Sequence, residues 1–123
     1  MVVNSSVAIV DDEKDLVRTF ELLFQRRNIP LSFTAFDGSI AIEKFKSANP
    51  RPGVMVIDYR LPTMDGLQVM KEILAIEPDT KVIFMSGDYS IEQECLDIGA
   101  TVFLKKPASI KTITDTVTRL MNL

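Results

Sequence analysis

Short apolar runs that alternate with segments of helical spacing constrain what this chain can fold into. Four runs are almost continuously apolar, at residues 7–10, 54–57, 81–85 and 101–104. Because side chains of a strand point alternately to its two faces, a run without polar alternation predicts a central strand covered on both faces. A fifth run, at 31–36, alternates in part, which is typical of a strand nearer the edge of a sheet.

Between these runs, apolar residues recur at helical spacing, which predicts amphipathic helices. The predicted stripes are Leu16, Phe20, Leu23 and Phe24; Ala41, Phe45 and Ala48; Leu67, Met70, Ile73 and Leu74; and, more briefly, Ile91, Cys95 and Leu96. The segment 110–121 alternates like a strand in its middle but also places apolar residues on one helical face. We predict a helix there, because threonine lowers helix propensity only modestly.

The order of strand followed by helix, repeated along the chain, predicts an α/β fold. Right-handed crossovers between parallel strands place helices on both faces of the sheet, so we expect a doubly wound parallel sheet. Breaks that contain proline or glycine precede the later strands, and no linker or repeat divides the sequence. We therefore expect residues 1–123 to form a single domain without an output domain.

The composition narrows the available chemistry. The chain contains no histidine and one cysteine, so the commonest general base is missing and no internal disulfide can form. Its formal net charge is -3, and its basic residues form no block, which argues against direct binding to nucleic acid. No apolar run approaches the roughly 20 residues of a membrane helix, and the N-terminus has no basic leader. We expect a cytoplasmic protein without membrane insertion.

Polar residues follow the predicted strands at the points where the strands end. They are Asp11, Asp12, Asp58, Ser86 and Lys106. Carboxyl ends of parallel strands meet at one edge of a sheet, so these side chains should converge if the middle strands are adjacent. Three carboxylates in one cleft repel one another, which favours a raised pKa or a bound hard cation such as Mg²⁺. A cation, an ammonium and a hydroxyl together suit the binding of a phosphoryl group.

Each of these residues alone has a simpler explanation. Asp11 or Asp12 would serve as the N-cap of the first helix, and Asp58 would serve as a turn residue. Ser86 and Lys106 carry almost no signal by themselves. Only their joint placement at strand ends points to a phosphate site.

Four motifs resemble those of response-regulator receiver domains. They are Val-Asp-Asp-Glu at 10–13, Val-Ile-Asp-Tyr-Arg-Leu-Pro-Thr-Met-Asp-Gly at 56–66, Phe-Met-Ser-Gly at 84–87 and Gly-Ala-Thr-Val-Phe-Leu-Lys-Lys-Pro at 99–107. The resemblance covers essentially the whole chain and implies a stand-alone CheY-like receiver of a two-component system or phosphorelay. It also implies a flavodoxin-like sheet with strand order 2-1-3-4-5. Such a domain is not an enzyme in the ordinary sense, because it catalyses only its own phosphoryl transfer and slow autodephosphorylation.

The resemblance implies roles for the acidic residues. Asp58 is the expected phosphoacceptor, and its donor is a sensor histidine kinase or a phosphotransfer protein. Asp12 and Asp58 are expected to bind Mg²⁺ together with the backbone carbonyl of Arg60. Asp11 is expected to act on the ion mostly through a bound water.

The resemblance also implies a switch. Ser86 and Lys106 are expected to contact the phosphoryl oxygens, and Lys106 is preferred to Lys105 because the family's lysine directly precedes a proline. Ser86 then moves toward the phosphoryl group, and Phe103 turns inward. The face formed by the fourth helix, fifth strand and fifth helix thereby changes its affinity for a downstream protein or for a second copy of the chain.

Some features depart from the family pattern. The interval from Ser86 to Gly99 is short, which predicts a shortened or reoriented fourth helix, and Ala108 replaces a common phenylalanine. Arg60 and Asp88 lie where family members tune access of hydrolytic water, and we predict that they pair across the mouth of the site.

Three other functions compete with the receiver. An aspartyl-phosphate phosphatase that depends on Mg²⁺ needs an acid two residues after its nucleophile, where this chain has Arg60. A flavodoxin-like cofactor carrier is disfavoured, because no G-x-G-x-x-G loop follows the first strand. A receiver-like scaffold that works without phosphorylation is disfavoured by the intact set of polar residues.

Overall fold

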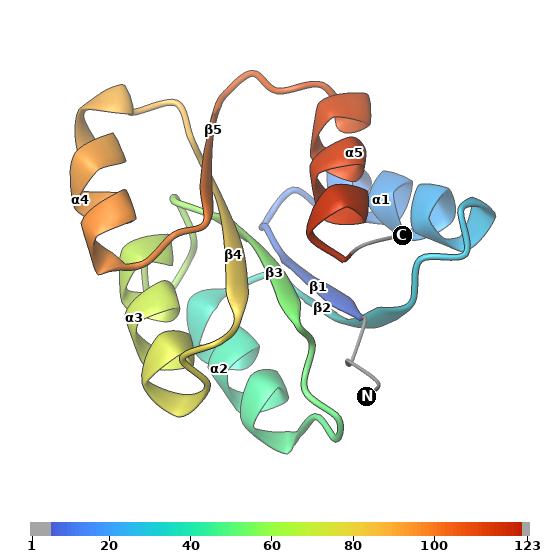
Figure 1. Cartoon of the computed structure of the whole chain (residues 1–123), viewed down its shortest axis with the longest axis horizontal. Helices are drawn as coiled ribbons and strands as arrows, with labels where there is room; N and C mark the ends of the chain where they lie inside the picture. Colours follow the sequence, from blue (N-terminus) through green and yellow to red (C-terminus); the bar gives the residue numbers. More distant parts are fainter. Residues whose placement is uncertain (1–5, 122–123) are drawn as a thin grey trace.

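A computed structural model describes residues 6–121, which form one sheet with helices on both of its sides (Figure 1). In chain order the elements are β1 (Val7–Val10), α1 (Lys14–Arg26), β2 (Leu31–Ala35), α2 (Gly38–Ser47), β3 (Val54–Asp58), α3 (Gly66–Ile76), β4 (Lys81–Ser86), a 3₁₀ turn (Tyr89–Ile91), α4 (Glu92–Ile98), β5 (Val102–Lys105) and α5 (Ile110–Leu120). The strands pair in parallel in the order 2-1-3-4-5. The predicted flavodoxin-like α/β class and strand order are confirmed.

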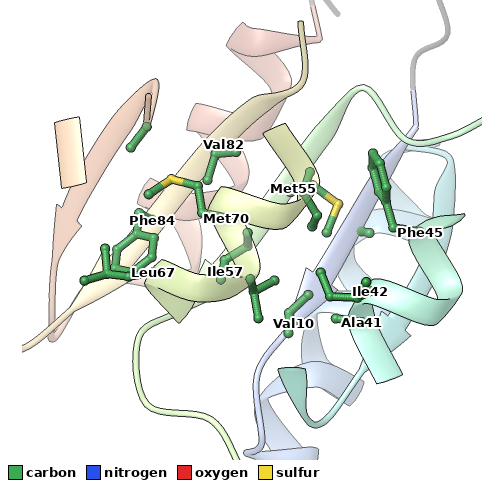
Figure 2. Packing of buried hydrophobic residues seen from close by; sticks show 14 of the residues in the cluster. Val10, Ala41, Ile42, Phe45, Met55, Ile57, Leu67, Met70, Val82 and Phe84 are labelled. Carbon is green, nitrogen blue, oxygen red and sulfur yellow. The ribbon is translucent and has the colours of Figure 1, made fainter. Parts of the chain in front are cut away.

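Apart from Asp58, Lys81 and Ser86 at strand ends, the three middle strands β1, β3 and β4 are apolar, as expected of strands that are buried on both faces. Along β1, Val7 and Ile9 belong to a core with α1 and α5, whereas Ala8 and Val10 belong to a second core with α2 and α3. Strands β3 and β4 divide their side chains between the two cores in the same way. Figure 2 shows the second core, in which side chains from α2 and α3 lie against the sheet.

The two edges of the sheet are β2 and β5. An edge position for β2 agrees with its alternating sequence. The central, fully covered strand predicted at 101–104 is wrong, because β5 is an edge strand and is only half-buried along Val102–Leu104. A run of four residues does not distinguish a central strand from an edge strand when the helix beside it is short. Helix α4 has seven residues and buries only Cys95.

The helices begin where polar side chains satisfy their first backbone N–H groups. Asp37, Asp65 and Ser109 each accept a backbone hydrogen bond at the start of α2, α3 and α5. The helix predicted at 110–121 is confirmed as α5. Its strand-like threonines fit the helix because the hydroxyls of Thr114 and Thr116 donate to carbonyls four residues earlier.

The predicted helical stripes are partly corrected. In α1 the buried residues are Val17, Phe20 and Phe24, so Val17 replaces Leu23 at the centre of the buried face. In α4 the predicted burial of Leu96 is wrong, because that side chain is 39% exposed. Within residues 6–121, the structure contains no helix with the length and apolarity to cross a bilayer.

The buried face of α1 gives a stability prediction. Phe20 is fully buried and Leu22 is 58% exposed, although only two positions separate them. We expect Phe20→Ala to lower the free energy of unfolding by about 3 to 5 kcal/mol, because a large cavity opens in the core. Leu22→Ala should change it by less than about 0.5 kcal/mol. Urea unfolding measures both, and equal losses would show that this face of α1 is assigned wrongly.

Candidate functional site

Three carboxylates meet at the carboxyl ends of β1 and β3. Val10 pairs with Ile57 in the sheet, so Asp11 and Asp58, the next residues along the two strands, are neighbours. One carboxylate oxygen from each of Asp11, Asp12 and Asp58 lies within 4.8 Å of the other two. Asp11 and Asp58 are buried, whereas Asp12 is exposed. The structure therefore brings together the three acidic residues that the sequence analysis placed on this edge.

Lys106 reaches the carboxylates from the segment after β5. Its ammonium nitrogen lies 2.5 Å from Oδ1 of Asp58 and 3.9 Å from Oδ2 of Asp11. Lys105, in contrast, is exposed, and its ammonium lies 5.2 Å from the centre of the Tyr89 ring. Lys106 is therefore the lysine that faces the acidic cluster.

Ser86 ends β4 at the same edge of the sheet and is buried. Its hydroxyl accepts a hydrogen bond from the backbone N–H of Asp88 at 2.9 Å and donates to the carbonyl of Asp88 at 3.3 Å. Phe103 of β5 is half-buried, and its ring stacks on Phe84 with the centroids 6.3 Å apart. The hydroxyl of Ser86 is thus bound to its own loop, and Phe103 lies against the core.

Burial dominates the electrostatics of the site. It raises the pKa of Asp11 to about 6, against a hydrogen bond from the Glu13 backbone that lowers it, and the charge of Asp58 raises it further. Burial also raises the pKa of Asp58, opposed by the hydrogen bond and the charge of Lys106. For Lys106 burial acts in the opposite direction, but the contact with Asp58 outweighs it and raises the pKa of the ammonium. In the site, the pKa values of two buried carboxyl groups are raised, which disfavours their charged forms, and the raised pKa of the Lys106 ammonium beside them favours its charged form.

The donor set fits a hard divalent cation. Oδ2 of Asp11 is buried and has no hydrogen-bond partner within the described residues 6–121, and the Lys106 ammonium at 3.9 Å is too distant to supply one. A buried carboxylate oxygen without a partner is costly, and a cation beside it removes that cost. Mg²⁺ prefers carboxylate oxygens and needs only a few of them. Asp11, Asp12 and Asp58 are the residues that would hold it.

The loop between β3 and α3 is fixed tightly against Asp58. The backbone N–H of Gly66 donates to the carbonyl of Tyr59 at 2.7 Å, and a Cβ at Gly66 would lie 2.3 Å from the carbonyl oxygen of Asp58. Thr63 has a φ of 68°, which is strained for a β-branched residue, and its hydroxyl accepts a hydrogen bond from the N–H of Ser39. These contacts hold the segment that contains Arg60.

Thr63 supports the site without having been predicted from the sequence. No sequence signal marks a threonine for positive φ, because this conformation is rare in β-branched residues. Gly66 ends the motif at 56–66, but the close approach of its backbone to the carbonyl of Asp58 is visible only in the structure.

Two alternatives from the sequence are wrong. The N-cap of α1 is Glu13, without a side-chain cap, and Asp11 is hydrogen-bonded to Glu13 before the helix starts. The predicted Arg60–Asp88 ion pair does not form. Asp88 accepts hydrogen bonds from the N–H and the hydroxyl of Ser90, and the Arg60 guanidinium lies 5.8 Å from the centre of the Tyr59 ring.

The raised pKa of Asp11 gives a prediction for the metal-free protein. The folded protein binds the proton of Asp11 more tightly than the unfolded chain does. The free energy of unfolding therefore falls as Asp11 loses this proton, between about pH 4 and about pH 6. We expect Asp11→Asn to raise the free energy of unfolding at pH 7 by on the order of 2 kcal/mol. The gain should vanish at pH below the unfolded value of 3.8.

Urea unfolding at several pH values measures this gain, and repeating it with Mg²⁺ provides the control. Added Mg²⁺ should stabilise the wild-type protein more than Asp11→Asn. If Asp11→Asn were less stable than the wild type at pH 7, the result would contradict a raised pKa of Asp11 in the folded protein.

Comparisons with known proteins agree with this geometry. Residues 7–118 match the response regulator receiver domain. Sporulation initiation phosphotransferase F of Bacillus subtilis is 28% identical over 122 residues, which cover 98% of this chain and 96% of that protein. Chemotaxis protein CheY of Thermotoga maritima is 30% identical over 103 residues, which cover 82% and 84% of the two chains.

Solved structures give the same result. The receiver domain of the Francisella response regulator 1452 superposes with a TM-score of 0.83 at 31% identity, covering 97% of this chain and 98% of that one. A chain of the CheX-CheY-BeF3-Mg complex of Borrelia burgdorferi superposes with a TM-score of 0.84 at 27% identity, covering 94% and 87%. The acidic cluster therefore resembles the Mg²⁺-binding sites of receiver domains. Because the family match spans nearly the whole chain, the protein belongs to the response regulator receiver domains, the phosphorylation-dependent signalling modules of two-component systems.

Proposed function

We propose that this chain is a phosphorylation switch in which Asp58 accepts a phosphoryl group. The observation that carries the proposal is the Lys106 ammonium 2.5 Å from Asp58, beside three carboxylates within 4.8 Å of one another. Mg²⁺ would be held by Asp11, Asp12 and Asp58 with the backbone carbonyl of Arg60. Receiver domains interact with histidine kinases or phosphotransfer proteins, and such a protein is the proposed donor here.

The transfer is a displacement at phosphorus. An oxygen of the Asp58 carboxylate forms a bond to phosphorus while the bond to the donor breaks, and the donor leaves with the bonding electron pair. The leaving group is the histidine nitrogen of a phosphorylated kinase or the acetate of acetyl phosphate. Bound Mg²⁺ supplies most of the charge stabilisation at the phosphoryl oxygens. Hydrolysis by water later breaks the bond between Asp58 and phosphorus and restores the carboxylate.

Lys106 has two functions in this scheme. Burial raises the pKa of Asp58, and the hydrogen bond and charge of Lys106 oppose that shift and so favour the ionised form of the nucleophile. As the phosphoryl group arrives, the same ammonium offsets the charge of its oxygens. An open surface groove of about 470 Å³, lined by Asp12 and Arg60 among others, lies next to the acidic cluster.

Ser86 and Phe103 form the proposed switch. To reach a phosphoryl oxygen, the Ser86 hydroxyl has to leave Asp88, to which it is hydrogen-bonded in the structure. That movement loosens the loop in front of α4 and lets Phe103 turn further inward. The face of α4, β5 and α5 then changes its affinity for a downstream protein or a second copy of the chain. Differences of about 1 to 3 kcal/mol are sufficient for such a population shift.

The alternatives have less support. An aspartyl-phosphate phosphatase would require a proton donor at the position of Arg60, and an arginine does not give up a proton at neutral pH. A scaffold that works without phosphorylation would not explain the costly burial of Oδ2 of Asp11, which has no hydrogen-bond partner in the described part of the chain. A single domain, a cytoplasmic location and output through protein contacts rather than direct nucleic-acid binding complete the proposal.

Acetyl phosphate tests the phosphoacceptor. With Mg²⁺ present, the intact mass should increase by one phosphoryl group in the wild-type protein and in Asp97→Asn, a control on α4 whose carboxylate accepts a hydrogen bond from Gln93. Asp58→Asn should show no increase, and a chelator should abolish it in the wild type. Labelling of Asp58→Asn at the wild-type rate would overturn the proposal. Repeated turnover of an external phosphate ester would support the phosphatase instead.

A separate experiment tests the switch. Phosphorylation should shift the NMR signals of the Phe103 ring in the wild-type protein. In Ser86→Ala, which loses the hydroxyl that must move, the same signals should shift much less even when the protein is fully phosphorylated. Equal shifts in both proteins would show that Ser86 does not connect Asp58 to β5.

A further inference from the structure

We propose that Tyr89 is a positioning residue that holds Lys106 in place for phosphoryl transfer. The inference rests on the proposed function, because Lys106 is the residue expected to contact the phosphoryl group. Tyr89 belongs to neither the acidic cluster nor the switch pair, and its sequence position gives no indication of a role.

The contact joins two loops at the rim of the sheet. The hydroxyl of Tyr89 donates a hydrogen bond of 2.7 Å to the backbone carbonyl of Lys106, seventeen residues away. The backbone N–H of Lys106 donates at 2.9 Å to the carbonyl of Ser86. Both backbone polar groups of Lys106 are thus bonded to the segment 86–89, and the two bonds close a ring between the loops.

Tyr89 is restrained through both its backbone and its ring. It begins the 3₁₀ turn before α4, and Asp88 caps that turn by accepting the N–H of Ser90 at 3.0 Å. The ammonium of Lys105 lies 5.2 Å from the centre of the ring, within the range of a cation–π contact. The ring is therefore held in its orientation although Tyr89 is 49% exposed.

Fixing the backbone of Lys106 matters because a lysine side chain is long and flexible. Its ammonium is a point charge on a four-carbon stem, so the position of the backbone decides whether the charge reaches Asp58. A small displacement of a catalytic group from its working geometry has a large effect on rate. The Tyr89 hydrogen bond restrains the carbonyl of Lys106, and the bond to Ser86 restrains its N–H.

Tyr89→Phe removes the hydroxyl and keeps the ring over Lys105. We expect this variant to react with acetyl phosphate about 3- to 10-fold more slowly than the wild type, as loss of one neutral hydrogen bond implies. The midpoint of urea unfolding should stay close to that of the wild type, because Tyr89 is 49% exposed. A slower reaction without a loss of stability is not expected of a merely structural role.

Ser90→Ala is the matched control. It deletes a hydroxyl from the same turn, which donates to Asp88 at 2.6 Å, but it preserves the backbone cap and the Lys106 contact. We expect it to react at the wild-type rate. A wild-type rate in Tyr89→Phe, or an equal loss in both variants, would overturn the role of Tyr89.

NMR without a phosphodonor separates this inference from the proposed function. In Tyr89→Phe, but not in Ser90→Ala, the carbonyl carbon of Lys106 and the methylene next to its ammonium should shift. Unchanged signals overturn the inference even if the wild type is phosphorylated. If the wild type accepts no phosphoryl group, the proposed function fails, and the shift alone then decides whether Tyr89 positions Lys106.

Discussion

The ion pair between Lys106 and Asp58 is the interaction on which the site depends. Burial of Asp11 and Asp58 raises the pKa of both carboxyl groups, and Lys106 is the cation placed against them. One ammonium does not balance three carboxylates, so the site keeps an excess of negative charge, and Oδ2 of Asp11 has no hydrogen-bond partner among residues 6–121. Burial and the charge of Asp58 raise the pKa of Asp11, and the divalent cation proposed for this site would offset both the excess charge and the unpaired oxygen.

This arrangement requires a particular strand order. Asp11 and Asp58 are neighbours because β1 pairs directly with β3, and Lys106 follows β5, two strands away from β3. Its long side chain has to extend past the end of β4, which buries Ser86 at the same edge. In a sheet with another order, the same residues would lie at strand ends without converging. The apolar middle strands, covered on both faces, are therefore a condition for the chemistry at their ends.

The sequence predicted the parts of the molecule that depend on local pattern. Apolar runs located all five strands, and the polar residues at their ends predicted which carboxylates would converge. The resemblance to receiver domains selected Lys106 over Lys105 as the lysine that joins them. Other features depend on contacts between distant segments, which periodicity does not encode. The edge position of β5, the exposure of Leu96 and the hydrogen bond of Tyr89 to Lys106 belong to this group. The Arg60–Asp88 pair failed for a similar reason, since Asp88 is occupied by Ser90, its near neighbour in the chain.

The two loops that flank Asp58 are held by different forces. The β3–α3 loop is held by close backbone approach, because neither Gly66 nor Gly38 has room for a Cβ. The β4–α4 loop is held by polar contacts of partly exposed groups, such as those of Asp88 and Tyr89. Packed backbone cannot shift without overlap, whereas exposed hydrogen bonds exchange with water at a small net cost. A phosphoryl group on Asp58 should therefore leave the β3–α3 loop in place and move the β4–α4 loop, which leads directly to the short helix on the proposed output face.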